Sequence, residues 1–589
     1  MDSYVAPLDD IISALRTVGL DEILTLPAFE GIDRATVADV LGGFAKLAGE
    51  VIAPSDRIGD TVGAMLDTAT GEVTVAPEIA NAYARYSEGG WTALSASAEF
   101  GGGGFPGLIA AANQEMFGSA NLALSLNPVL TQSAIELLER WADERQRSVF
   151  LSRLIDGTWT GTMNLTEPDA GSDLGAVRTT ATPIEGDPAN ATRYAITGTK
   201  IFITWGEHSM TENIIHLVLA RLPGAPEGTR GISLFIVPKF NVDDAGALLE
   251  RNGVQCLALE HKLGIHASPT CVLQFTDAIG ELVGSVNGGM AAMFSMMNPA
   301  RLAIGLQGVS VGERAFQQSS AFAHERRQGR SKDNTTSSAS VIAEHPDVKR
   351  MLLDMAVTVD ASRLLVYLAV AAADVANDHP DAEERARSQR RMELLTPLAK
   401  AWPTDEGVRV ASLGVQIHGG MGFIEETGIA QRYRDARITP IYEGTNGIQA
   451  IDLVGRKIAR DNGLAVNELL DEISVTIDRA DGIAELSNAA KSLSEAAHQC
   501  RAAVTWIVEQ FANNADAVLA GATVFLDLLA TTVAGSLLIK QAADHIEDGS
   551  PDATRRVACS EFFAFDRLTR LPSLQSISLG NELLTAGLR

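Results

Sequence analysis

Cysteine is scarce in this chain, and its four cysteines show none of the spacings that hold metals. Cys256, Cys271, Cys500 and Cys559 form no CxxC pair and have no histidine at metal-ligand spacing. This pattern argues against a zinc site and against a disulfide framework. We therefore expect no metal site, and a reducing, cytoplasmic location fits best.

Positive charge is also in short supply. The chain has 47 Lys and Arg against 74 Asp and Glu, a formal net charge of -27. Such a field repels phosphate polymers and anionic lipid surfaces, so nucleic acid is not an expected partner. An anionic substrate would need a local cluster of arginines that the fold brings together.

Leader and membrane signals are lacking as well. Met1 is followed by an acidic amphipathic segment without a basic or apolar region, so no secretion signal is expected. One apolar stretch, Ala517 to Ile539, is long enough to cross a bilayer, but Asp527 lies at its centre, and Thr531, Thr532 and Ser536 also interrupt it. We predict a buried helix there and no integral membrane span.

No glycine run carries a dinucleotide-binding fingerprint. The four glycines at 101–104 are not preceded by a strand and followed by a helix and an acidic residue in the required arrangement. A nicotinamide partner is therefore disfavoured. The loop from Glu99 to Pro106 is either a plain helix connection or a segment next to a bound ligand.

The hydrophobic pattern divides the chain into α, β and α regions. With 589 residues, 46% of them hydrophobic, several domains are expected. Apolar residues recur at helical spacing from Ala35 to about Leu154, and again from about Gly288 to Ala459. Short β-rich runs separated by Gly, Pro and Asp clusters occupy the region between Gly161 and Val283. A further helical segment follows Asn462.

Two motifs far apart in the sequence point to chemistry. One is Tyr442-Glu443-Gly444-Thr445-Asn446-Gly447, and the other is Met163-Asn164-Leu165-Thr166-Glu167-Pro168-Asp169-Ala170-Gly171-Ser172-Asp173. At these residues the chain resembles the acyl-CoA dehydrogenase family. It is most similar to a longer bacterial branch that includes the 3-methylmercaptopropionyl-CoA dehydrogenases of dimethylsulfoniopropionate catabolism.

The resemblance implies an α+β multidomain fold with five parts. These are an N-terminal extension (1–34), an N-terminal α domain (35–160), a middle β-barrel or sandwich domain (161–283), a four-helix bundle with the catalytic Glu (284–461) and an additional C-terminal helical domain (462–589). FAD is the implied cofactor. Homodimers or tetramers, and an electron-transferring flavoprotein as electron acceptor, are implied partners.

Glu443 is the expected catalytic base. Desaturation of an acyl thioester needs one group to remove the α-proton and a cofactor to take the β-hydride. Burial beside an apolar acyl chain would raise the pKa of Glu443 toward neutrality. Some family members carry the base at the position matched by Ala300, where alanine cannot accept a proton.

The resemblance places the flavin ring against two segments. The Leu165 amide and the Thr166 hydroxyl are expected at its pyrimidine edge, and Ser172 near the pyrophosphate. In the strand that contains Phe202 and Thr204, alternation sends both side chains to one face. Phe202 is expected to cover the ring, where many relatives have Trp, and Thr204 to bond near N5.

The distal half of FAD is expected at three further places. Arg326 is the predicted pyrophosphate ligand of the neighbouring subunit, with Arg327 as the alternative register. The segment with Gln416, Gly419 and Gly420 is expected to wrap the ADP portion. Thr445 and Gly447 complete the predicted cofactor set, whereas His418 is expected to be a structural hydrogen-bonding residue.

The expected contacts of the acyl-CoA substrate are Ser172, Arg301, Glu443 and Gly444. Arg301 is expected to contact CoA, to contact the loop that carries Glu443, or to have a purely structural role. A short, sulfur-containing acyl chain is preferred as substrate, with a medium or long fatty acyl chain as the alternative. A flavin oxidase that reacts with oxygen and a non-catalytic, flavin-binding regulatory protein are the competing functions.

Overall fold

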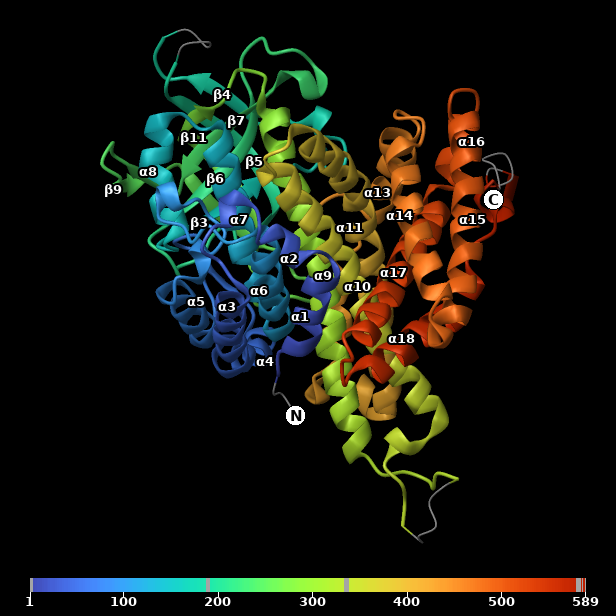
Figure 1. The fold of residues 1–589 in the computed structure, drawn as a ribbon. Coiled ribbons are helices and arrows are strands. Elements are labelled where there is room, and N and C mark those ends of the chain that lie inside the picture. Colours follow the sequence, from blue (N-terminus) through green and yellow to red (C-terminus); the bar gives the residue numbers. More distant parts are fainter. Residues whose placement is uncertain (1–3, 187–190, 333–337, 579–583, 585, 588–589) are drawn as a thin grey trace. The chain divides into compact units, whose positions relative to one another are not determined.

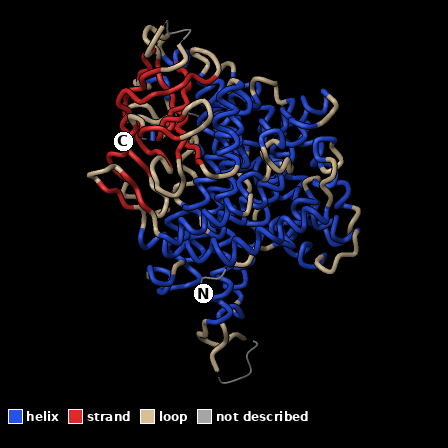
Figure 2. The backbone as a smooth tube through the Cα atoms, turned by 90° about the vertical axis from the view of Figure 1, so that its left-hand side faces the viewer, coloured by secondary structure: helices blue, strands red, loops and turns tan. Residues whose placement is uncertain are grey.

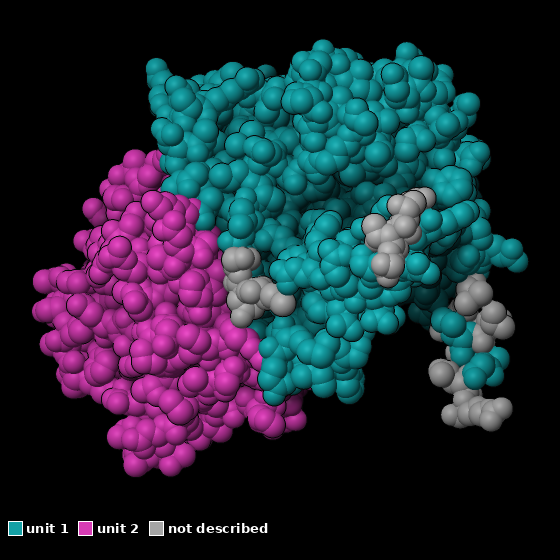
Figure 3. Space-filling view, turned by 90° about the horizontal axis from the view of Figure 1, so that it is seen from below, with its two compact units in different colours: residues 1–45, 106–119, 301–589 teal, residues 46–105, 120–300 magenta. Residues whose placement is uncertain are grey.

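The chain folds into two compact units, each made of separate stretches of sequence. The structure is a computed structural model that describes residues 4–186, 191–332, 338–578, 584 and 586–587. Unit 1 comprises residues 1–45, 106–119 and 301–589, and unit 2 comprises residues 46–105 and 120–300 (Figure 3). The predicted N-terminal α domain is thus divided between the units. The linear division into five domains stays a prediction.

Unit 2 is built around a seven-stranded sheet, which gathers most of the strands of the chain (Figure 2). The strand order is β10-β11-β5-β4-β6-β3, and β7 pairs with both β11 and β6. Strands β11, β5, β4, β6 and β7 therefore close into a ring, which confirms the predicted β-barrel. The strands are β3 (Trp159–Asn164), β4 (Thr180–Pro183), β5 (Tyr194–Thr204), β6 (Asn213–Arg221), β7 (Ile232–Pro238), β10 (Val254–Leu259) and β11 (Thr270–Val283).

Successive side chains along the strands of this barrel point to opposite faces, and each face contributes to a different hydrophobic core. Val218 and Phe235 pack with Tyr194 in one buried cluster. Their neighbours Leu217 and Ile236 belong to another cluster, shared with helices α7 (Leu122–Trp141) and α8 (Glu144–Ile155). Because both faces are buried, β6 and β7 are nearly continuous apolar runs, interrupted by His216 and Ser233, rather than alternating ones.

The remaining elements of unit 2 are short. They are α4 (Ala53–Val62), α5 (Pro77–Glu88), the hairpin of β1 (Met65–Asp67) with β2 (Glu72–Thr74), and the hairpin of β8 (Phe240–Val242) with β9 (Leu248–Arg251). The β1–β2 hairpin lies within the stretch predicted to be helical. Its strands have three residues each, which is too short for a period of two to be recognised in the sequence.

Unit 1 is helical, and long antiparallel helices form its centre (Figure 1). Three helices contribute residues to both units, namely α3 (Arg34–Leu47), α6 (Gly107–Ala120) and α9 (Gly289–Glu325). The other helices of unit 1 are α1 (Leu8–Thr17), α2 (Leu20–Ile23), α10 (Pro346–Asp378), α11 (Ala382–His418), α12 (Ile429–Ala436), α13 (Asn446–Asp452), α14 (Leu464–Asp481), α15 (Ser487–Phe511), α16 (Ala515–Ala520), α17 (Ala522–Glu547), α18 (Ala553–Asp566) and α19 (Leu574–Ile577).

Among the described residues, two helices are apolar and long enough to span a membrane by composition alone. These are α10 and α17, and the most apolar windows of the two helices are 89% and 83% buried inside the structure. Helix α17 packs on α10, α11, α13, α14, α15 and α18. This supports the prediction that the apolar stretch around Asp527 is a buried helix.

Close helix packing within unit 1 depends on glycine. A Cβ atom added at Gly308 of α9 would lie 2.3 Å from the carbonyl oxygen of Pro403 in α11. On α11, Gly407 is equally close, because a Cβ there would lie 2.6 Å from the carbonyl oxygen of Gly308. Since a side chain at either position would overlap backbone atoms, only glycine allows this approach of α9 to α11.

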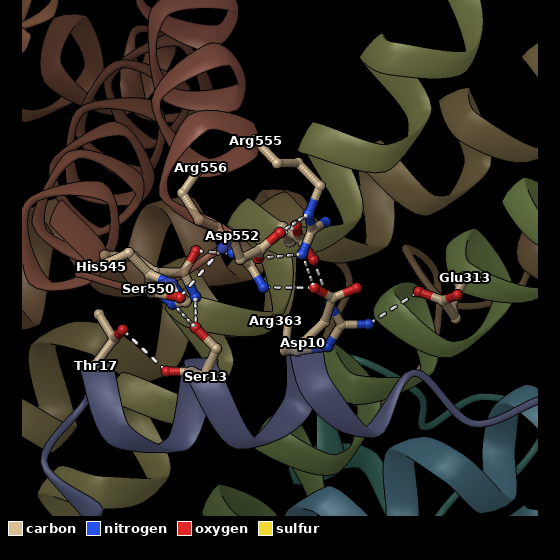
Figure 4. Close-up of polar contacts among 12 residues, drawn as sticks. Asp10, Ser13, Thr17, Glu313, Arg363, His545, Ser550, Asp552, Arg555 and Arg556 are labelled. Carbon is tan, nitrogen blue, oxygen red and sulfur yellow. Dashed lines mark hydrogen bonds and ion pairs between the residues drawn. The ribbon is translucent and has the colours of Figure 1, made fainter. Parts of the chain in front are cut away.

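The N-terminal helix α1 docks on helices from the far end of the chain (Figure 4). Ser13 Oγ lies 2.8 Å from His545 Nε2, and Lys540 Nζ donates to the Thr17 carbonyl at 2.5 Å. Arg556 of α18 pairs with Asp10 at 2.5 Å. The N-terminal extension and the C-terminal helical segment therefore stabilise each other.

A buried arginine, Arg363, continues this polar network into the centre of unit 1. Its guanidinium contacts Glu115 of α6 at 2.8 Å, Glu313 of α9 at 2.9 Å and Asp360 of α10 at 2.5 Å. Burial disfavours the guanidinium charge, but the three carboxylates outweigh it and raise the pKa of Arg363. One side chain thus joins three helices.

Candidate active site

The loop between α12 and α13 presents Glu443 in an uncommon backbone conformation. Glu443 has φ 53° and Gly444 has φ 81°, so two successive residues are left-handed. Asn446 N donates to the Pro440 carbonyl at 3.0 Å, and Gln449 Nε2 donates to the Gly444 carbonyl at 3.1 Å. Positive φ is unfavourable for glutamate, and such conformations cluster at functional sites, where surrounding contacts hold them.

The surroundings of Glu443 disfavour its negative charge. The side chain is half-buried, and burial raises the pKa of its carboxyl group against the opposing charges of Arg301 and Lys400. The adjacent Tyr442 hydroxyl donates to Gln307 Oε1 on α9. Burial thus acts on the pKa of Glu443 in the direction that the sequence analysis expected.

Arg301 lies at the base loop. A Cβ atom added at Gly444 would lie 3.7 Å from Arg301 Nη2, which places the guanidinium beside the residue after the base. Burial lowers the pKa of Arg301, while Asp452 and Glu443 oppose that effect. Of the roles considered for Arg301, contact with the base loop agrees with this geometry. Thr445 and Gly447, the predicted cofactor contacts that follow, are both exposed.

The segment predicted for the pyrimidine edge of the flavin is held against β5. Ile201 N donates to the Thr166 carbonyl at 2.9 Å, and Lys200 Nζ donates to the Leu165 carbonyl at 3.1 Å. Lys200 also pairs with Glu167 at 2.8 Å. Leu165 and Thr166 are both half-buried, so the two predicted flavin contacts remain accessible while their backbone is fixed.

Phe202 and Thr204 follow on β5 with the predicted alternation. Phe202 is 58% exposed, Thr204 is half-buried, and Ile203 between them is buried. Phe202 adopts φ 59°, and the pairing of β5 with β11 shifts register beside it. Thr162 Oγ1 donates to the Thr204 carbonyl at 2.7 Å. An exposed aromatic ring is suited to stacking on a planar ligand.

The residues predicted for the phosphates lie on exposed loops and helix ends. Ser172 is exposed and is followed by Asp173, whose carboxylate caps a short turn by accepting from Gly175 N at 2.8 Å. Arg326 and Arg327 are both exposed, and Arg327 Nη1 donates to the Ala339 carbonyl at 3.0 Å. Because this bond engages the Arg327 guanidinium, Arg326 is kept as the predicted pyrophosphate ligand. Part of the polar insert after Arg330, residues 333–337, lies outside the described residues.

Helix α11 ends at the glycine-rich segment predicted for the ADP portion. Gln416, Gly419 and Gly420 are exposed, and a Cβ atom at either glycine would meet no atom within 4 Å. His418 is buried, its Nδ1 donates to the Gly414 carbonyl at 2.8 Å, and its ring stacks on Phe322 with 4.2 Å between ring centroids. These contacts agree with the structural role expected for His418.

Two buried lysines, one in each unit, were not recognised in the sequence. Lys200 and Lys400 are both 0% exposed. Burial lowers the pKa of each to about 8. The available signal was a single lysine within an apolar run, as in Leu398-Ala399-Lys400-Ala401-Trp402. A lysine is almost never fully buried without a partner, so such a position calls for one.

Glu167→Gln is expected to destabilise unit 2 by about 2–4 kcal/mol, because Lys200 would keep its charge without a buried counter-ion. Glu167 accepts from Lys200, from Arg178 N at 2.7 Å and from the Thr179 hydroxyl at 2.6 Å. Urea unfolding and the FAD content of the purified protein measure the effect. Asp169→Asn is the control, since its pair with Arg178 is exposed and is expected to contribute at most about 1 kcal/mol. Equal stability of the two variants would contradict the prediction.

Comparisons with known proteins identify the class. Among solved structures, an acyl-CoA dehydrogenase from Caenorhabditis elegans in complex with C11-CoA has a TM-score of 0.81 at 19% identity, covering 99% of this chain and 95% of that one. An acyl-CoA dehydrogenase from Bacillus anthracis complexed with FAD has a TM-score of 0.72 at 20% identity, covering 100% and 90%. At these identities the likeness establishes the fold, that of the acyl-CoA dehydrogenases.

Sequence similarity establishes the family. Residues 162–278 match the acyl-CoA dehydrogenase middle domain, residues 287–458 the acyl-CoA dehydrogenase C-terminal domain, and residues 469–582 an acetyl-CoA dehydrogenase C-terminal-like domain. The chain is 42% identical to a 3-methylmercaptopropionyl-CoA dehydrogenase from Ruegeria pomeroyi over 100% of both chains. It is 30% identical to a broad-specificity linear acyl-CoA dehydrogenase from Mycobacterium tuberculosis over 98% of this chain and 97% of that one.

The chain therefore belongs to the acyl-CoA dehydrogenase family and is an acyl-CoA dehydrogenase. This confirms the family and the long bacterial branch indicated by the motifs around Glu443 and Leu165. It also confirms FAD as the cofactor at the level of the family.

Proposed function

We propose that this enzyme introduces a trans double bond between Cα and Cβ of an acyl-CoA thioester, with Glu443 as the base. The observation that carries the proposal is the half-buried Glu443 carboxylate, whose pKa burial raises, on a loop fixed in the left-handed conformation. A base whose pKa lies closer to neutrality removes a weakly acidic proton more effectively. Glu443 would take the α-proton, and its backbone N–H would donate to the thioester carbonyl as negative charge develops there.

The residues of unit 2 fit a flavin. FAD, when bound, supplies the acceptor for the β-hydride. The exposed Phe202 ring would stack on the flavin, and Thr204 would donate near N5. The Leu165 amide and the Thr166 hydroxyl would donate to the pyrimidine edge, where their fixed backbone supports this role.

The other half of the cofactor would be bound across a subunit interface. We propose a homodimer, or a tetramer of two such dimers, in which Arg326 reaches the pyrophosphate bound by the neighbouring copy. Its exposure supports this assignment, as does the exposure of Gln416, Gly419 and Gly420, which would wrap the ADP portion. An electron-transferring flavoprotein is the proposed electron acceptor, and the cytoplasm is the proposed location.

The proposed substrate is 3-methylmercaptopropionyl-CoA or a similar short acyl-CoA. The 42% identity over the whole length with the Ruegeria pomeroyi enzyme of that name supports it. A medium- or long-chain fatty acyl-CoA is the second candidate, supported by the 30% identity with the mycobacterial enzyme named for linear acyl-CoAs. Ser172, Arg301 and Gly444 are proposed substrate contacts.

Anaerobic bleaching of the FAD-loaded enzyme tests the proposal. The panel consists of 3-methylmercaptopropionyl-CoA and straight-chain acyl-CoAs of increasing length, and the decay of flavin absorbance is followed for each. We expect the fastest bleaching with the thioether substrate. Preference for longer chains would move the enzyme to general fatty-acid oxidation. No bleaching by any of these compounds would overturn the proposed desaturation, and rapid reoxidation by air would identify an oxidase.

A further inference from the structure

Lys400 bonds to both ends of the loop that carries Glu443. Its Nζ donates to the Thr439 carbonyl at 3.0 Å and to Asn446 Oδ1 at 2.8 Å. Thr439 precedes and Asn446 follows residues 440–445, and Lys400 itself is fully buried in α11. A single ammonium group thus fixes the separation between the two ends of the base loop.

Asn446 extends this attachment to the backbone of α11. Its Nδ2 donates to the Ala401 carbonyl at 3.0 Å and to Thr404 Oγ1 at 3.0 Å. Thr404 Oγ1 in turn donates to the Lys400 carbonyl at 2.9 Å. Within this network the donors and acceptors are mutually satisfied, so the ammonium group and the amide of Asn446 hold each other in place.

Lys400 also supplies one of the two positive charges that face the base. Burial raises the pKa of Glu443, and Arg301 and Lys400 oppose this increase. The groups that surround these three are the Tyr442 hydroxyl beside Glu443, Asp405 facing Lys400, and Asp452 and Arg456 facing Arg301. Without the lysine charge, the carboxylate form of Glu443 would be less stable.

We propose that Lys400 is a positioning residue for the catalytic base, which it serves by tethering both ends of the 440–445 loop and by stabilising the carboxylate form of Glu443. This inference rests on the proposed role of Glu443. In this role Lys400 acts through the loop and through its charge.

The test compares pH profiles of flavin reduction in single turnovers of the FAD-loaded enzyme. Lys400→Met removes both the tether and the charge, Asn446→Ala removes part of the tether and keeps the charge, and Lys400→Arg keeps the charge. We expect Lys400→Met to lower the limiting rate constant about tenfold and to move the acid limb of the profile upward by about one pH unit. Asn446→Ala should lower the rate constant without moving the acid limb. In Lys400→Arg the acid limb should lie closer to its wild-type position than in Lys400→Met.

A purely structural lysine would not shift the pH profile. If Lys400→Met retains the wild-type acid limb in its FAD-loaded fraction, the inference is overturned, whatever happens to the rate or to the melting temperature. The proposed function is judged separately, by whether the wild-type enzyme is bleached at all and whether Glu443→Gln prevents it. Should Lys400→Met fail to fold, the acid limbs of Lys400→Arg and Asn446→Ala test the inference instead. A shifted acid limb in Asn446→Ala, which keeps the lysine charge, would contradict the role assigned to that charge.

Discussion

Glu443→Gln is expected to slow the reduction of FAD by acyl-CoA by about a thousandfold, within the range usual for loss of a general base. Glutamine has nearly the same shape as glutamate and should adopt the same left-handed backbone conformation at this position, but it cannot accept a proton. FAD content and substrate binding should therefore persist, while the single-turnover rate of FAD reduction falls. Stopped-flow absorbance of the anaerobic enzyme measures that rate directly.

The control for this experiment is Glu485→Gln. Glu485 is an exposed carboxylate in a short turn of the C-terminal helical segment, and its loss should leave the rate unchanged. Reduction of Glu443→Gln at the wild-type rate would show that another group removes the α-proton.

The wild-type rate should also depend on pH in a defined direction. Because burial raises the pKa of Glu443 above the ordinary carboxyl value, its carboxylate form is lost as the pH falls through that raised pKa. The acid limb of flavin reduction should therefore lie above pH 4.5, the usual pKa of a glutamate. A limb at or below that value would contradict the assignment.

Arg363→Met should have the largest effect on stability, a loss of about 3–5 kcal/mol from the free energy of unfolding. The substitution would leave Glu115, Glu313 and Asp360 clustered in the interior without the cation that they share. Burial already raises the pKa of both Glu313 and Asp360, so without Arg363 these groups would bind protons or unfold the cluster. Urea unfolding followed by circular dichroism is the measurement.

Helix α10 offers a matched control for this change. Arg350 pairs with Asp347 at 2.9 Å with the same spacing of three residues as Arg363 and Asp360, but both side chains are exposed. Arg350→Met should cost at most about 1 kcal/mol. Arg363→Lys, which keeps the charge with fewer donors, should fall between the two. Similar unfolding curves for Arg363→Met and Arg350→Met would refute the role given to burial.

Much of the fold was predictable because it follows from local pattern. The change from helical spacing to β-rich runs near Gly161 and back near Gly288 corresponds to the observed β3–β11 and α9. Positions of side chains along a strand were predictable for the same reason, as in Phe202 and Thr204. The β1–β2 hairpin was missed, since three-residue strands carry no periodic signal.

The sequence by itself determined the family and the order of α and β regions, and it predicted Glu443 as the base, because these depend on residue type and spacing along the chain. Only the tertiary structure decided the left-handed conformation of Glu443, the burial that raises its pKa and the cations that oppose it. Lys400 and Glu443 are separated by more than a helix in the chain, and the interaction between them exists only after α11 and the base loop pack together. Electrostatic energy depends on the distance between charges and on their burial, and neither quantity can be derived from the order of residues alone.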